Sequence, residues 1–359
     1  MQVINYIMIA MAIIAAIDRV IGNRFGLGAE FEHGIKMIAP VTLSMAGMLV
    51  VAPYISHLLM GVASSVPTFF DFSVIPSALI ANDMGGAHLA LSLAENETMG
   101  YYNGLILGSM LGCTVSFTLP FVLGATDKKH HKNIIVGILC GIITVPVGCI
   151  VGGLIAQVPF VDMLLGLVVP VILSALIAVG ILKFEKITVK IFVIFGWLIK
   201  LIITFGLIVG IVEFLTGYAI LPYMSPFPEV FEILVNIVCV MAGAFPLLFV
   251  LRKLLEKPFA ALGRLLGINS TAVSGLFFTM GNSVTTFETV DSMDERGVIL
   301  NSAFAVSGSF VFIDHLAFTL SFNSDYVPAM VAAKLVAGVL AVAFACFFLK
   351  LKKKKAHIG

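Results

Sequence analysis

The sequence has very little charge for its length. Of its 359 residues only 11% are Asp, Glu, Lys or Arg, whereas 60% are hydrophobic and the mean hydropathy is +1.11. A water-soluble domain of this size needs far more polar surface. The apolar residues also come in runs of about twenty, which is the length of a transmembrane helix. The composition therefore argues against a soluble protein and predicts an all-α polytopic membrane protein.

Motifs for catalysis, metal binding and export are also missing. The chain has no HExxH, GxSxG, P-loop or Asp-rich diphosphate motif, so it offers no catalytic site, and no metal or cofactor is predicted. The five cysteines lie in apolar runs without a CxxC pair, which favours packing roles. A net charge of +1 gives no general attraction to nucleic acid. Residues 1–22 lack a basic leader and a cleavage site and are interpreted as a retained span.

Basic residues predict which loops face the cytoplasm. They gather at 18–36, 127–132, 183–190, 251–264, 296 and 350–355. The loops around 62–67, 95–98, 157–161, 216–228 and 322–327 contain none. All of the basic clusters lie inside only if two runs with polar residues near their centres, 68–94 and 268–290, do not cross the membrane. The alternative is that both runs are ordinary spans and that the charge rule is violated.

The predicted topology follows from this constraint. It has about nine full spans, with the N-terminus out and the C-terminus in. These spans are expected at 4–21, 39–61, 100–123, 134–156, 162–182, 189–215, 229–250, 298–321 and 328–350. Two re-entrant helical hairpins complete the chain, the first at about 68–94 from outside and the second at about 268–290 from inside.

The order of these segments predicts an inverted-topology repeat. Residues 1–156 form the first repeat, 157–188 a connecting span and loop, and 189–359 the second repeat. Segment starts correspond between the halves: 39 with 229, 68 with 268, 100 with 298, and 134 with 328. Inverted repeats with interrupted helices near the bilayer midplane are typical of secondary transporters.

The hairpin tips are the first candidates for a binding site. The tips ANDMGGAHLA (81–90) and TMGNSVTTFE (279–288) contain residues that tolerate positive φ and bond freed backbone groups. Irregular backbone at this depth is tolerated where it lines a cavity. The candidate substrate-binding residues are Asn82, Asp83, Met84, Gly85, Gly86, Gly281, Asn282, Ser283, Thr285, Thr286, Phe287 and Glu288.

Charged side chains within spans form a second set of candidates, because each needs a partner or a task. Asp83 either binds a small cation or caps the second half-helix of its hairpin. Asp314 and Lys334 are expected at equal depth in neighbouring spans, which predicts an ion pair. His315 is a proton carrier, a packing residue or a substrate contact. Lys200 lies near the midplane, within conceivable reach of Asp83.

Three stretches of the chain resemble one known family. They are LIANDMGGAHLALSLAENETMGYYNGLILGSMLG (79–112), VGILCGIITVPVGCIVGGLIA (136–156) and FVFIDHLAFT (310–319). They are similar to the EutH ethanolamine permeases of bacterial ethanolamine-utilisation operons, over essentially the whole chain. The resemblance implies import of ethanolamine across the bacterial plasma (inner) membrane to supply ethanolamine ammonia-lyase. It assigns no individual roles to the motif residues.

The implied substrate suits the candidate residues. Ethanolamine is mostly an ammonium ion at neutral pH, for which Asp83 and the tip carbonyls are the expected acceptors and Phe287 is a candidate cation–π face. Glu288 either lines the same cavity or is a neutral or paired residue near the inner surface. Asn82, Asn282, Thr285 or Thr286 would bind the hydroxyl of ethanolamine. Alternating access between the two hairpins is the expected mechanism. A facilitative channel and an integral-membrane enzyme are the alternatives, and both energy coupling and homo-oligomerisation stay open.

Overall fold

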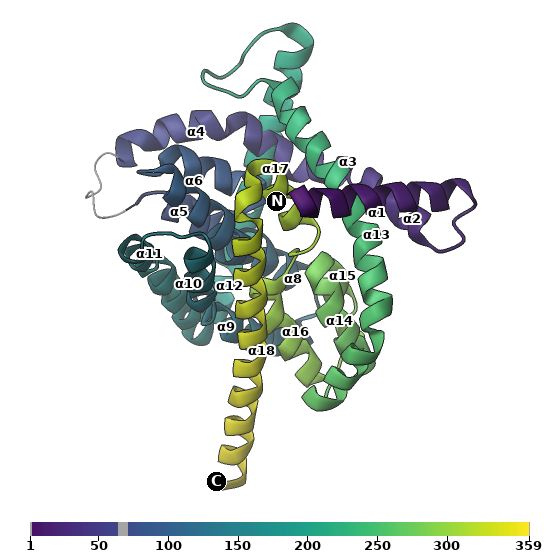
Figure 1. Ribbon diagram of the computed structural model, residues 1–359. Helices are drawn as coiled ribbons and strands as arrows, with labels where there is room; N and C mark the ends of the chain where they lie inside the picture. Colours follow the sequence, from purple (N-terminus) through teal and green to yellow (C-terminus); the bar gives the residue numbers. More distant parts are fainter. Residues whose placement is uncertain (1, 64–70, 359) are drawn as a thin grey trace.

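The computed structural model describes residues 2–63 and 71–358, and every regular element in these ranges is a helix (Figure 1). Seven helical stretches are long and apolar enough to cross a bilayer, or up to eight if one pair bent by 119° is a single span. The seven stretches are Leu27–Val62, Glu97–Ala125, Lys128–Ile155, Phe160–Gly180, Lys186–Thr216, Phe227–Leu255 and Asp314–Leu351. The prediction of an all-α, multi-pass membrane protein is confirmed. The exact number of spans and the orientation of the termini stay predictions.

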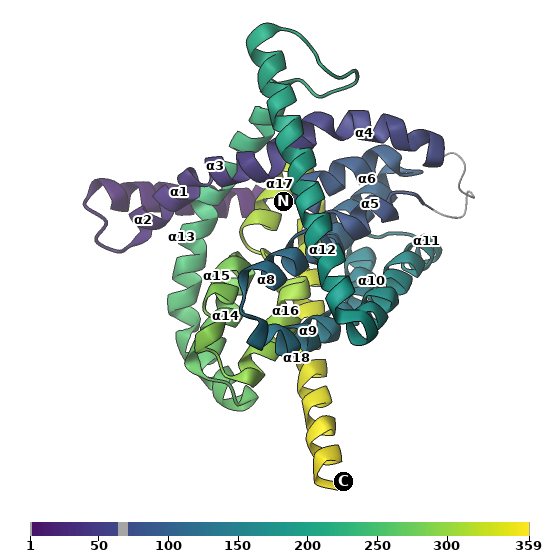
Figure 2. The same ribbon diagram turned by 180° about the vertical axis from the view of Figure 1, so that it is seen from behind.

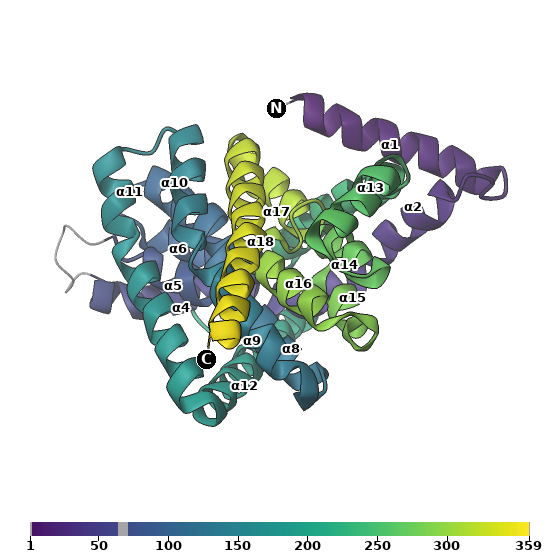
Figure 3. The same ribbon diagram turned by 90° about the horizontal axis from the view of Figure 1, so that it is seen from below.

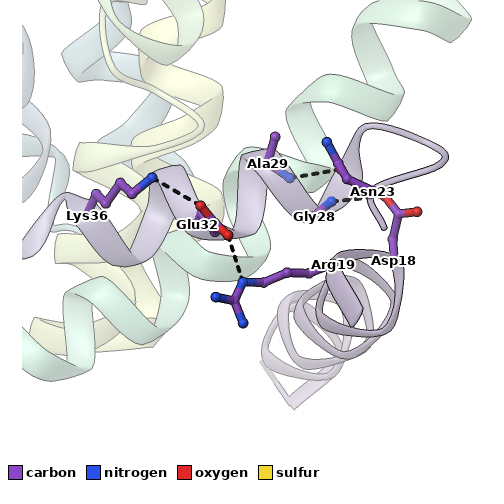
Figure 4. A network of polar contacts seen from close by, with 7 residues as sticks. All are labelled: Asp18, Arg19, Asn23, Gly28, Ala29, Glu32 and Lys36. Atoms are coloured by element: carbon purple, nitrogen blue, oxygen red, sulfur yellow. Dashed lines mark hydrogen bonds and ion pairs between the residues drawn. The ribbon is translucent and has the colours of Figure 1, made fainter. Parts of the chain in front are cut away.

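The first helices form a hairpin of their own at one corner of the molecule, on the opposite side from α10 and α11 (Figure 3). They are α1 (Gln2–Val20) and α2 (Leu27–Lys36). The turn between them is held by the carboxylate of Asp18, which accepts the backbone N–H groups of Phe25, Leu27 and Gly28. Figure 4 shows the bond to Gly28. Glu32 then bridges Arg19 and Lys36 at 2.8 and 3.1 Å (Figure 4).

The rest of the first half runs from residue 38 to residue 155. Its elements are α3 (Ile38–Val41), η1 (Thr42–Ala46), α4 (Gly47–Ala63), α5 (Val74–Leu79), η2 (Asn82–Gly86), α6 (Ala87–Leu93), α7 (Glu97–Tyr101), η3 (Tyr102–Gly112), η4 (Thr114–Thr118), α8 (Leu119–Ala125), α9 (Lys128–Ile142) and α10 (Val145–Ile155). Four of these, η1, η2, η3 and η4, are wide π-helical turns, and η2 contains two residues with non-helical backbone, Met84 and Gly85. Such turns are rare in proteins and gather at functional sites.

The second half contains longer helices. Its elements are α11 (Phe160–Gly166), α12 (Val168–Thr216), α13 (Phe227–Leu266), α14 (Ser270–Gly281), α15 (Ser283–Glu288), η5 (Val290–Ser292), α16 (Glu295–Gly308), α17 (Asp314–Asn323), η6 (Ser324–Tyr326) and α18 (Val327–Ile358). Helix α12 has a non-helical residue at Phe184, which separates the two runs expected at 162–182 and 189–215. Helices α12 and α13 flank the loop that leaves the body of the molecule at the top of Figures 1 and 2.

Both polar-interrupted segments turn back on themselves. In the first, the N–H of Glu95 donates to the Asp71 carboxylate at 3.2 Å, so the two ends of the segment meet. In the second, the N–H of Asn269 donates to the Asp294 carboxylate at 2.8 Å. Helices α5 and α6 lie side by side in Figures 1 and 2, and so do α14 and α15. Residues 68–70 of the first predicted hairpin lie outside the described residues.

The first hairpin packs against a face of small residues on η3. A Cβ added to Gly104 would lie 2.9 Å from Ala87 Cα, and one added to Gly112 would lie 2.3 Å from the carbonyl oxygen of Ile80. The spacing of these glycines therefore lets the π-helical turn approach the hairpin backbone closely.

The span expected at 298–321 is not a continuous helix, which corrects the prediction. Helix α16 ends at Gly308 and α17 begins at Asp314, and between them Phe310 has a positive φ of 62°. The freed backbone bonds instead to the second hairpin, because the N–H of Phe310 donates to Thr279 O at 3.0 Å and that of Phe312 to Met280 O at 2.9 Å. Hydrogen bonds to a neighbouring segment thus replace those of the helix.

A glycine substitution tests the first tip. Gly85 has φ +90°, and a Cβ there would lie 2.1 Å from Met48 Cγ. We expect Gly85→Ala to lower the free energy of unfolding by about 2 kcal/mol or more, because left-handed backbone costs a non-glycine residue 1–2 kcal/mol before any clash. The matched control is Gly124→Ala, where a Cβ meets nothing within 4 Å. Equal thermal unfolding of the two variants in detergent would contradict this structure of the tip.

Candidate functional site

Four ionisable side chains come together where the break in the first hairpin faces the break between α16 and α17. His315 Nε2 lies 3.9 Å from Asp83 Oδ1. Asp83 also interacts electrostatically with Asp314 and with Lys334. The ammonium group of Lys334 donates a hydrogen bond of 2.5 Å to the carbonyl oxygen of Ser109 on η3. We call Asp83, Asp314, His315 and Lys334 the charged cluster.

The break in the first hairpin sets the position of Asp83. Helix α5 ends at Leu79, and Ile80 is extended. The N–H of Ala81 donates to the Ser116 hydroxyl at 3.0 Å, whereas the Ala81 carbonyl accepts the N–H groups of Met84 and Gly86. Asp83 lies in the first turn of η2, which continues into α6, and its carboxyl group interacts with the backbone N–H groups of Asp83 and Met84, so capping the half-helix and binding a cation both stay predictions.

The second break sets the positions of Asp314 and His315. The backbone N–H of His315 donates to the carbonyl oxygen of Phe310 at 3.1 Å, which closes the turn that starts α17. Asp314 is the first residue of that helix, where the positive end of the helix dipole favours a carboxylate. The ring of Phe310 lies 5.5 Å from the His315 ring and packs with Ala81 and Cys113. This break thus joins the charged cluster to the first hairpin.

The cluster is largely closed to solvent. Lys334 is fully buried, His315 is 1% exposed, and the Asp83 side chain is 19% exposed. Next to Asp83, Asn82 is fully buried, and neither atom of its side-chain amide has a hydrogen-bond partner among the described residues. His315 Nδ1 also lacks a partner there. Buried polar atoms in native proteins are almost always bonded, so these groups are free to bond a ligand.

The cluster contains two carboxyl groups and one amino group, and its net charge depends on which of them are ionised. With Asp83 and Asp314 ionised, Lys334 protonated and His315 neutral, it carries one net negative charge. A charge left unbalanced in a buried site is costly. Binding one monovalent cation next to the carboxylates removes that cost. No group of three or more His, Cys, Asp or Glu residues suited to a metal ion is present in the described part of the chain.

Among the described residues, Asp314 and Lys334 do not form the predicted ion pair. The ammonium group of Lys334 donates instead to the backbone carbonyl of Ser109. The expectation assumed a continuous helix from 298 to 321, and the break at 309–313 changes where Asp314 points. Lys200 is exposed on α12 and has no ion pair with Asp83 among the described residues. It lines a cavity of about 570 Å³ beside the first tip, together with Met84 and Ser116.

Two candidates on the second hairpin, Thr286 and Phe287, are buried in packed positions. Thr286 is buried, with its hydroxyl bonded to Gly275 O and to the hydroxyl of Thr279, both at 2.9 Å. Phe287 is 3% exposed and belongs to the main hydrophobic core. Thr285 and Glu288 are exposed. None of these four has a contact with Asp83 among the interactions of the described residues.

The tip of the second hairpin is linked to the site indirectly, through residues 309–313. Asn282 caps α15 by accepting the N–H of Val284, Ser283 is buried without a partner for its hydroxyl, and Gly281 packs close to Ile313. The two tips are joined through residues 309–313, because Phe312 bonds Met280 O and Phe310 packs with Ala81. A short unwound segment therefore lies between the two hairpins.

Two elements of the site were missed at the level of sequence. One is the break at 309–313, for which the small residues Ser307, Gly308 and Ser309 were a weak signal before Asp314. The other is the π-helical turn η3, which offers the Ser109 carbonyl to Lys334. A π-helical turn has no sequence signature of its own, so that acceptor was not predictable.

Comparison with known proteins places the chain among relatives of similar length. The model of the family described as "Ethanolamine utilisation protein, EutH" matches residues 1–348. A "Probable ethanolamine permease EutH" of Listeria monocytogenes is 42% identical over 359 residues, covering 99% of this chain and 96% of the relative. Its counterpart in Salmonella typhimurium is 33% identical, covering 96% and 94%. The "Uncharacterized protein YxeR" of Bacillus subtilis is 34% identical, covering 98% and 95%. No solved structure matches the chain.

Substitutions of two adjacent threonines test which of them packs inside the protein. Thr286→Val removes a buried hydroxyl that has two hydrogen-bond partners, so we expect the free energy of unfolding to fall by about 1–2 kcal/mol. Thr285→Val changes an exposed hydroxyl and should stay within about 0.5 kcal/mol of the wild type. Thermal or denaturant unfolding of the purified variants measures both. A larger loss for Thr285→Val than for Thr286→Val would contradict the packing of this hairpin.

Proposed function

The chain belongs to the EutH family of ethanolamine utilisation proteins, and from this premise we propose that it carries ethanolamine across a membrane. Its function is then that of a permease and not of an enzyme. The observation that carries the proposal is the charged cluster, in which two carboxyl groups and one amino group lie together; with all three ionised, its one net negative charge would match one ethanolammonium ion. In this proposal Asp83 and Asp314 accept the ammonium group.

The cluster also has groups for the other end of the substrate. Ethanolamine carries a hydroxyl two carbons from its ammonium, and a hydroxyl both donates and accepts one hydrogen bond. The side-chain amide of Asn82 provides a donor and an acceptor next to Asp83, and both lack partners among the described residues. A buried site built to bond a substrate hydroxyl strongly rejects an analogue without it. Ethylamine should therefore bind much more weakly than ethanolamine.

Lys334 has a separate role in this proposal. Its ammonium group donates to the Ser109 carbonyl and forms no ion pair with Asp83 or Asp314 among the described residues, which leaves both carboxyl groups to the substrate. It lowers the negative charge of the empty site from two to one, which limits the cost of burying Asp83 and Asp314 together. With two unopposed carboxylates the site would need two cations.

We propose alternating access as the mechanism. The second hairpin and the break at 309–313 share two backbone hydrogen bonds, so a displacement of the hairpin moves Asp314 and His315 relative to Asp83. Such a movement opens and closes the site without breaking either hairpin. A channel would give flux that rises linearly with concentration, whereas this carrier should saturate and show counterflow. An inside-negative potential favours entry of the cation by about 2.3 kcal/mol per 100 mV.

We also propose the architecture that the sequence predicts. Two inverted repeats, 1–156 and 189–359, are joined by a connecting span and loop at 157–188. Matched contacts support it. Gly47 packs against the Ile203 carbonyl, and at corresponding positions Gly243 packs against the Met8 carbonyl.

Hydrogen bonds to the hairpins form a second matched pair. Asn103 donates to Ser73 at 2.9 Å, and Asn301, at the corresponding position, donates to Ala272 O at 2.8 Å. The same kind of side chain thus holds the start of each hairpin.

We further propose that the protein lies in the bacterial inner membrane and imports ethanolamine for catabolism. Assembly into a homo-oligomer, as for many carriers with opposed hairpins, is an additional hypothesis.

Removing a carboxylate of the cluster tests the binding site. Asp83→Asn and Asp314→Asn each delete a charged acceptor, so we expect ethanolamine affinity to fall by about 10- to 100-fold. Asp325→Asn, an exposed carboxylate in the loop after α17, is the matched control and should bind as the wild type does. Equilibrium binding and uptake into proteoliposomes provide the measurements. Unchanged affinity in both cluster variants would remove the carboxylates from the site.

Single cysteines in a cysteine-free background test the topology. Cysteines at Val62 and Glu95 flank the first hairpin and should react with a membrane-impermeant thiol reagent from outside the cell. Cysteines at Leu265 and Glu295 flank the second and should react only after the cells are opened. Labelling of Val62 and Glu95 from opposite sides would mean that the first segment crosses the membrane.

A further inference from the structure

A cavity separate from the charged cluster lies where the end of α13 meets the start of α14, at the lower end of these helices in Figure 1. Its volume is about 680 Å³. The chain turns by 119° between Lys257–Leu266 and Ser270–Gly281, and this turn opens the space between the two helices. Neither ethanolamine binding nor the hairpin tips require the cavity.

The polar side of the cavity is basic. Arg252, Lys253 and Arg264 line it and are exposed. Among the described residues no carboxylate lies within ion-pair distance of these three, although Glu30 on α2 interacts with Arg252 electrostatically. The hydroxyls of Ser270 and Ser274 also line the cavity, in the first turns of α14, where the helix dipole is positive. These groups are the ones that bind a phosphate.

The other side of the cavity is apolar. Phe259 and Phe277 line it and pack edge to face, with ring centroids 5.4 Å apart. The basic side chains lie over neighbouring rings, Arg252 4.9 Å from the centroid of Phe278 and Lys253 4.4 Å from that of Phe249. Beside them Leu254 and Leu265 are 70% and 81% exposed, which suits a surface in contact with acyl chains. The cavity therefore joins a phosphate-binding rim to an apolar floor.

We propose that this cavity binds the headgroup of an anionic phospholipid, with an acyl chain along its aromatic side. The positive charges of Arg252, Lys253 and Arg264 complement a phosphodiester, and the apolar side of the cavity offers no polar contact to a free inorganic ion. The same basic residues form one of the clusters that the charge distribution assigns to the cytoplasmic side, so the lipid belongs to the inner leaflet. A bound lipid at the end of α13 would fix the base from which the second hairpin starts.

Lipid binding to the full-length protein in detergent, measured by native mass spectrometry, tests the proposal. Dioleoyl-phosphatidylglycerol should bind at least tenfold more tightly than dioleoyl-phosphatidylcholine. The triple variant Arg252→Gln, Lys253→Gln, Arg264→Gln should lose about 100-fold in affinity for phosphatidylglycerol, or ~5-fold per charge. The matched control removes three basic residues of another cluster, Arg19→Gln, Arg24→Gln, Lys36→Gln, and should keep the preference.

A second variant keeps the test valid if the triple variant does not fold. Ser274→Trp retains all three charges and fills the cavity, so it should also lose phosphatidylglycerol. Equal binding of the two lipids to the wild type would overturn the proposal, and so would undiminished binding to the Ser274→Trp variant. Displacement of the lipid by inorganic phosphate at an equal concentration would assign the cavity to a free anion instead, which also contradicts it.

Discussion

The structure depends on one constraint: a helix interrupted inside a membrane must find other partners for the backbone groups that the interruption frees. At the first hairpin the N–H of Ala81 finds the hydroxyl of Ser116. Between α16 and α17 the N–H groups of Phe310 and Phe312 find the carbonyls of Thr279 and Met280 on the second hairpin. The first interruption is therefore held by η4 and the second by the second hairpin, and the two breaks lie close to each other.

The binding site follows from the proximity of the two breaks. Residues next to a break, such as Asp83 and Asp314, lie beside unwound backbone and not on a lipid-facing helical surface. The same arrangement places the Ser109 carbonyl of the π-helical turn within 2.5 Å of the Lys334 ammonium. Two carboxylates and one ammonium in a closed space leave one negative charge, which fits a small organic cation. The place where the freed backbone groups find hydrogen-bond partners is therefore also the place where a small cation would balance the charge.

The sequence predicted more of the fold than of the site. The polar residues of ANDMGGAHLA predicted an interruption there, and Gly85 has the expected positive φ, whereas Gly86 has a helical φ of −58°. Asp83, Asp314, His315 and Lys334 were all named in advance because charges are rare in spans. Their pairing was wrong for Asp314 and Lys334, since depths counted along a straight helix fail when the helix is broken. On the second hairpin, Thr286 and Phe287 were chosen for residue type alone, and burial against the core gives them packing roles.

An experimental structure with ethanolamine bound is the most direct test of the central claim. The account predicts density for the substrate between the two breaks, with its nitrogen within hydrogen-bonding distance, about 2.7–3.2 Å, of the Asp83 carboxylate. Its hydroxyl should then lie against the amide of Asn82. Substrate density away from both Asp83 and Asp314 would contradict this binding site.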